Sequence, residues 1–86
     1  MVRKQQCNQL YFATIAYIKY EKGEIGRKPA FTTIVKRIWY YGLYYGLKFD
    51  ESEPDDITAM KAQIEIALGA AAAVEVMGAY KELNLL

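Results

Sequence analysis

The chain has 86 residues, of which 53% are hydrophobic and 24% charged, so it has the length of one domain and the composition of a folded protein. It contains no histidine and only one cysteine, Cys7, which excludes an intramolecular disulfide and a cysteine-based metal cluster and removes the commonest general base. We therefore expect no catalytic site, no metal, no cofactor and a cytoplasmic protein.

The formal net charge of +1 conceals two halves of opposite charge. Residues 1–49 hold nine of the eleven Lys and Arg and only two acids, whereas residues 50–86 hold eight acids and only two bases. Eleven of the twelve aromatic residues also lie in the first half. We infer that the two halves either pack against each other or bind different partners.

Apolar residues recur at helical spacing from residue 4 to residue 22, which predicts an amphipathic helix of about five turns. Its expected apolar face consists of Cys7, Leu10, Tyr11, Thr14, Ile15, Tyr17 and Ile18. Phe12 and Ala16 interrupt the opposite, polar face, and a partner surface is one reason for such an interruption. The glycines of GEIG, residues 23–26, are expected to end the helix.

Pro29 suits the first turn of a second helix, which we expect over residues 30–47. The residues expected to point inward are Phe31, Ile34, Ile38, Tyr41 and Tyr45, flanked by Val35, Trp39, Gly42 and Gly46. A strand is the alternative for residues 37–47, because the repeated tetrapeptide YYGL also returns to one face of a sheet and Tyr and Trp favour strands. A helix is preferred because the periodic segment is long for a strand.

The outer face of this second helix combines cations with aromatic rings. Cations bind phosphate groups and rings stack on bases or cover a protein partner, so this face is the predicted partner-binding surface. Its residues, with two that precede the helix, are Arg27, Lys28, Lys36, Arg37, Tyr40, Tyr44 and Lys48.

A long Ala-rich helix is expected over residues 54–83, after the acidic capping sequence DESEPDD. One apolar stripe holds Ile57, Met60, Ile64, Ala67, Leu68, Ala71 and Gly78, and a second, on roughly the opposite side, holds Ala59, Ile66, Ala73, Met77 and Tyr80. Tyr41, Tyr45 and Trp39 are expected to fill the space that Ala67, Ala71 and Ala72 leave.

A helix that is apolar on two sides must be covered on two sides, which predicts a homo-oligomer or a subunit of an assembly. The predicted interface consists of Ile66, Ala73, Glu75, Met77 and Tyr80. Glu75 is expected either to be exposed or to form an ion pair with Arg37 or Lys36 of another subunit.

These features predict an all-α domain over residues 1–86, with two medium helices and one long C-terminal helix, completed by oligomerisation. The predicted function is that of a small non-catalytic interaction, regulatory or inhibitor protein, whose size and economy also suit a virus or mobile element. The alternative is a nucleic-acid-binding regulator that uses the basic, Tyr-rich face of the second helix. We expect no membrane span and no small-molecule substrate.

Overall fold

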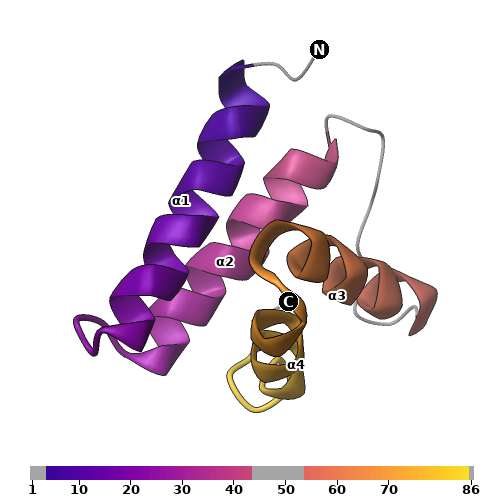
Figure 1. The fold of residues 1–86 in the computed structure, drawn as a ribbon. Coiled ribbons are helices and arrows are strands. Elements are labelled where there is room, and N and C mark those ends of the chain that lie inside the picture. Colours follow the sequence, from indigo (N-terminus) through magenta and orange to yellow (C-terminus); the bar gives the residue numbers. More distant parts are fainter. Residues whose placement is uncertain (1–3, 44–53, 86) are drawn as a thin grey trace.

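The computed structural model describes residues 4–43 and 54–85, and these residues form four helices and no strand. The helices are α1 (Lys4–Glu21), α2 (Arg27–Leu43), α3 (Pro54–Leu68) and α4 (Ala70–Gly78). In Figure 1, α1, α2 and α3 follow one another from left to right, and α4 folds back beneath α3. The all-α prediction is confirmed, and the strand alternative is wrong for residues 37–43; residues 44–47 lie outside the described residues.

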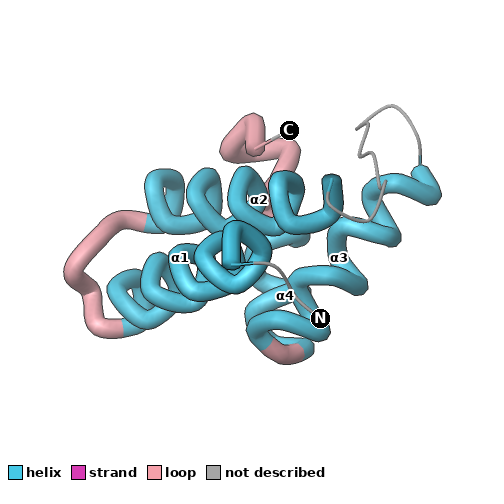
Figure 2. The backbone as a smooth tube through the Cα atoms, turned by 90° about the horizontal axis from the view of Figure 1, so that it is seen from above, coloured by secondary structure: helices cyan, strands magenta, loops and turns pink. Residues whose placement is uncertain are grey.

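α1 ends in a turn that needs a glycine. Gly23 has a φ of 76°, and its N–H donates to the carbonyl of Tyr20 while the N–H of Glu24 donates to the carbonyl of Lys19. These two bonds are the pattern of a Schellman motif, which satisfies carbonyls that the helix end leaves without partners. The turn places α2 antiparallel to α1, and both views show the two helices side by side (Figures 1 and 2).

α2 begins at Arg27, three residues before the predicted start, because Gly26 already accepts the first helical hydrogen bond, from the N–H of Ala30. Pro29 still lies in the first turn, where its missing N–H costs nothing. The predicted inward residues Phe31, Ile34 and Ile38 are completely buried, so this part of the prediction is confirmed.

The principal neighbour of α2 is α1, not the Ala-rich segment that the sequence had suggested. α1 buries Ala13 and Ala16, whose small side chains let α2 approach closely, and the ring of Tyr20 meets Phe31 edge to face at 4.9 Å. The predicted apolar face of α1 was therefore rotated, since Tyr11 and Ile18, which it included, are exposed.

The predicted long C-terminal helix is divided at Gly69, which has a φ of 100° and a ψ of 163°. At 100° per residue, Met60 and Ala73 would lie about 220° apart around a straight helix, and so would Ile64 and Met77. The change of direction at Gly69 turns both stripes toward one core, in which all four side chains are buried. Helix α4 ends at Gly78, and residues 79–84 form turns.

The core accordingly draws side chains from all four helices. α2 supplies the largest share, and α3 and α4 close over it from one side. The largest completely buried side chains are Phe31, Ile34, Val35, Ile38, Met60, Ile64 and Val76.

Gly23→Ala should lower the free energy of unfolding by about 1 kcal/mol, because a Cβ disfavours a positive φ. A Cβ at this position would meet no atom within 4 Å, so the loss is one of backbone conformation and not of space. Chemical denaturation with circular dichroism measures it.

Gly78→Ala is the matched control, since its added Cβ also meets nothing and its φ is not positive. It should leave stability unchanged or raise it by up to about 1 kcal/mol. Equal losses from the two substitutions would contradict the role of Gly23.

Candidate protein-interaction surface

Two large rings of α1 point away from the core. Tyr11 is 61% exposed and Phe12 is 45% exposed, and the rings meet edge to face with centroids 5.6 Å apart. Ala13 and Ala16 form the side of α1 that packs into the core. Tyr11 and Phe12 lie on other sides of the same helix, so their rings face outward.

Arg37 of α2 joins these rings to the second helix. Its guanidinium carbon lies 4.8 Å from the centre of the Phe12 ring, and its Nη1 donates a hydrogen bond of 3.2 Å to Oε1 of Gln9. The sequence placed Arg37 on the solvated outer face, but the side chain is half-buried against α1. A guanidinium held by a ring and an amide is pre-ordered, so it loses less rotamer freedom when a partner binds.

Lys36, Trp39 and Tyr40 continue the surface along α2. The rings of Trp39 and Tyr40 stack with centroids 6.1 Å apart and an interplanar angle of 12°, and Nζ of Lys36 lies 6.0 Å from the centre of the Tyr40 ring. Both rings are exposed, Trp39 by 41% and Tyr40 by 39%. The predicted exposure of Lys36 and Tyr40 agrees with this arrangement.

Tyr11, Phe12 and Arg37 form one group of contacting side chains, and Lys36, Trp39 and Tyr40 form another. Arg37 and Tyr40 are three residues apart on α2, so the two groups adjoin and are taken together as one surface. We call it the aromatic–cationic face, and it consists of Tyr11, Phe12, Lys36, Arg37, Trp39 and Tyr40. No acid occurs in residues 1–20 or 25–43, so the sequence on which the face stands is exclusively basic. The sequence does not indicate that Tyr11 and Trp39 belong to this face, because helical periodicity places both near the core.

The other predicted partner-binding residues lie apart from this face or outside the described residues. Nη2 of Arg27 forms an ion pair with Oε1 of Glu82 at 2.6 Å, so Arg27 is engaged within the chain. Lys28 is exposed at the start of α2. Tyr44 and Lys48 lie outside the described residues.

The predicted oligomer-interface residues are separated by the bend at Gly69. Ala73 and Met77 are buried inside the chain, which removes them from the surface. Ile66 is 79% exposed, Tyr80 is half-buried, and Glu75 is exposed. The apolar stripe that argued for a second copy is thus largely covered by the chain itself.

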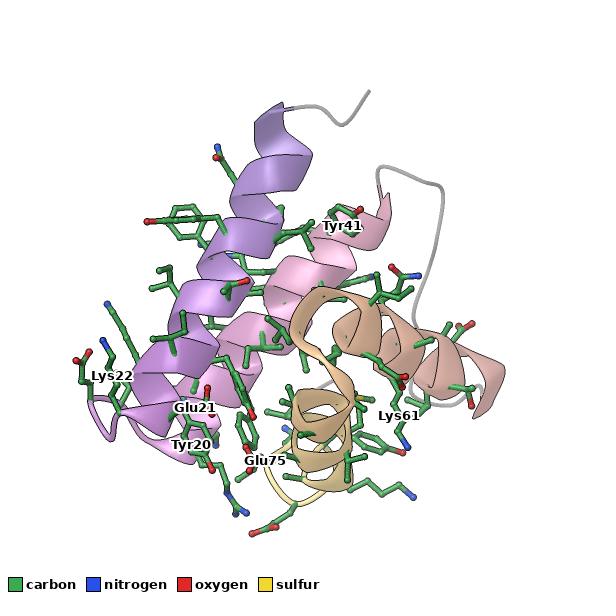
Figure 3. The ribbon with its side chains drawn as sticks, viewed as in Figure 1. Tyr20, Glu21, Lys22, Tyr41, Lys61 and Glu75 are labelled. Carbon is green, nitrogen blue, oxygen red and sulfur yellow. The ribbon has the colours of Figure 1, made fainter. Side chains whose placement is uncertain are left out.

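A group of phenols and carboxylates lies at the end of α1 and on α4. Figure 3 shows Tyr20, Glu21 and Glu75 at this end of the molecule. Burial raises the pKa of the Tyr17 phenol above its ordinary value of 10.0, and the charges of Glu75 and Glu21 raise it further. Glu75 therefore lies near a phenol of its own chain, and its predicted ion pair with Arg37 or Lys36 of another subunit stays a prediction.

Within residues 4–43 and 54–85, no group of three or more Cys, Asp or Glu residues is placed to hold a metal ion. No helix in the same ranges is both long enough and apolar enough to cross a membrane. No family model, no curated protein and no solved structure matches this chain. No relative therefore supplies a function for the aromatic–cationic face.

Glu75→Gln should lower the pKa of Tyr17 toward its ordinary value, because one of the two nearby carboxylate charges is removed. Alkaline titration of tyrosinate absorbance, compared with the same titration of a Tyr17→Phe protein, isolates the Tyr17 contribution. An unchanged Tyr17 transition in the Glu75→Gln protein would contradict the contact.

The same phenol gives stability a definite pH dependence. Since the folded state holds the Tyr17 proton more tightly than the unfolded chain does, its contribution is complete below about pH 10 and is lost as the pH rises through the raised pKa. Tyr17→Phe should make this alkaline loss smaller, as measured by thermal unfolding across that range.

Proposed function

We propose that this chain is a small non-catalytic interaction protein that binds an acidic partner protein through the aromatic–cationic face and acts as a regulator or inhibitor. The observation that carries the proposal is the exposure of Trp39 and Tyr40 as a stacked pair beside the cation Lys36. Trp, Tyr and Arg are the residue types that contribute most of the binding energy at protein interfaces.

The face is also arranged to bind at a low entropic cost. Trp39 and Tyr40 restrict each other by stacking, and Phe12 and Gln9 restrict Arg37. Side chains that are already ordered lose little freedom on association, so more of the contact energy is left for affinity.

Charge selects the kind of partner. The segments of α1 and α2 that carry the face contain no acid near it. A positive potential raises the rate of encounter with an acidic protein surface and the specificity for such a surface. Apolar rings between the cations favour a partner that also offers aliphatic or aromatic side chains.

Nucleic acid is the second candidate, supported by the exposed cation Lys36 beside the exposed ring of Tyr40. Two observations favour protein over nucleic acid. Arg27 is already paired with Glu82, which leaves one cation fewer for phosphates. Trp39 and Tyr40 also cover one face of each other's ring, where a base would otherwise stack.

The double substitution Trp39→Ala with Tyr40→Ala should reduce partner binding at least tenfold, because both central rings of the face are removed. The measurement is affinity capture from a native lysate of the encoding cells, with and without nuclease, followed by a titration of the captured protein. Folding should change little, since both rings are exposed.

Ile18→Ala is the matched control, because Ile18 is as exposed as Tyr40, at 39%, but lies outside the face. It should bind as the unmodified chain does. Binding that survives the double substitution would refute the face. Capture that disappears with nuclease, together with salt-dependent binding of a single-stranded oligonucleotide, would support the nucleic-acid candidate instead.

A further inference from the structure

Gly69 connects α3 and α4 through a backbone conformation that only glycine adopts readily. Its φ of 100° and ψ of 163° lie in a region that side chains with a Cβ avoid. It is exposed, and a Cβ built on it would meet no atom within 4 Å. Its conformation is therefore not imposed by crowding at the residue itself.

The sequence around Gly69 locally favours a straight helix. Residues 70–73 are four alanines, the strongest helix formers, and α4 begins without a side chain that caps its first turn. The N–H of Gly69 donates to the carbonyl of Glu65, and the carbonyl of Gly69 accepts from Ala73, so helical bonds reach the bend from both sides. Burial of the inner face of α4 opposes straightening, as do the packing of the C-terminal turns on the core and the ion pair between Arg27 and Glu82.

A single chain cannot straighten without losing part of its core. Ala73, Val76 and Met77 would leave the core cluster and enter water. In a pair of chains, however, α4 of each copy can occupy the place that α4 of the other has left, with the same contacts. Short connections under conformational strain favour this exchange.

We propose that Gly69 is a hinge and that two copies of this chain form a dimer by straightening there and exchanging residues 70–85. The proposal concerns α3, α4 and the C-terminal turns, and it does not depend on the aromatic–cationic face. The partner is a second copy of this chain.

The exposed apolar residues around the hinge supply the new contact that such a dimer requires. Ile66 is 79% exposed and Val74 is 60% exposed, and in a straight helix they fall on one stripe with the exposed Ala70 between them, at spacings of four residues. Two such helices crossing at Ala70 would cover this part of the stripe in each copy, a contact that the single chain does not have. The contact is self-complementary, as an interface with twofold symmetry must be.

The ion pair between Arg27 and Glu82 gives a marker for the exchange. Arg27 stays with α1 and α2, whereas Glu82 moves with the exchanged segment. The pair therefore forms within one chain in the monomer and between two chains in the proposed dimer.

The first test is Gly69→Ala, measured by size-exclusion chromatography with light scattering over a range of concentrations. The dimer dissociation constant should fall about tenfold for each of the two hinges, because Ala is strained in the bent form and favoured in the straight one. Ile66→Ser with Val74→Ser should reverse this gain while leaving the monomer folded. Gly78→Ala is the control and should not change dimerisation.

The second test establishes exchange and needs no change at the hinge. One protein carries Arg27→Glu and a second protein carries Glu82→Arg. Each protein alone then has two like charges at positions 27 and 82. Exchange between the two proteins brings opposite charges together at both of these sites. After mixing and concentrating, native mass spectrometry should find heterodimers favoured about fivefold over random pairing.

A Gly69→Ala protein that keeps its helix content and remains monomeric would overturn the proposal. Dimers of the two charge variants in random proportions would also overturn it, since they would show association without exchange. If Gly69→Ala fails to fold, the charge-variant mixture decides, and the absence of a heterodimer there refutes the exchange.

Discussion

The bend at Gly69 is the constraint on which the remaining packing depends. Met60 and Ala73 belong to stripes on nearly opposite sides of a straight helix, and a chain of 86 residues has too few other elements to cover both. A change of direction at one residue turns both stripes toward one core. The chain thereby gains a fourth helix and a closed core at the cost of one glycine held in a restricted conformation.

The sequence predicted the helices well because helical periodicity is a local property. The stripe of Phe31, Ile34 and Ile38 is regular and uninterrupted, and it proved to be the centre of the core. The break at Gly69 was not predictable in the same way. A glycine inside a helix costs only about 1 kcal/mol, so its presence among alanines is compatible with a straight helix as well as with a bend. Long-range burial decides between them.

The candidate site was predicted in part for a related reason. Lys36 and Tyr40 were placed correctly because both lie on the side of α2 opposite its apolar stripe. The contact of Arg37 with Phe12 depends on how α1 is rotated, and α1 has apolar residues on more than one side. Periodicity cannot choose among such sides, whereas packing does so through the small residues Ala13 and Ala16.

Those two alanines also have a consequence for how this surface can change during evolution. They set the separation of α1 and α2, and that separation places the Phe12 ring beneath the Arg37 guanidinium. A larger residue at either position would spread the helices and alter the geometry of the aromatic–cationic face without replacing any of its exposed residues. If the face binds a partner as proposed, its binding preference changes through substitutions hidden in the interior while the exposed residues stay the same.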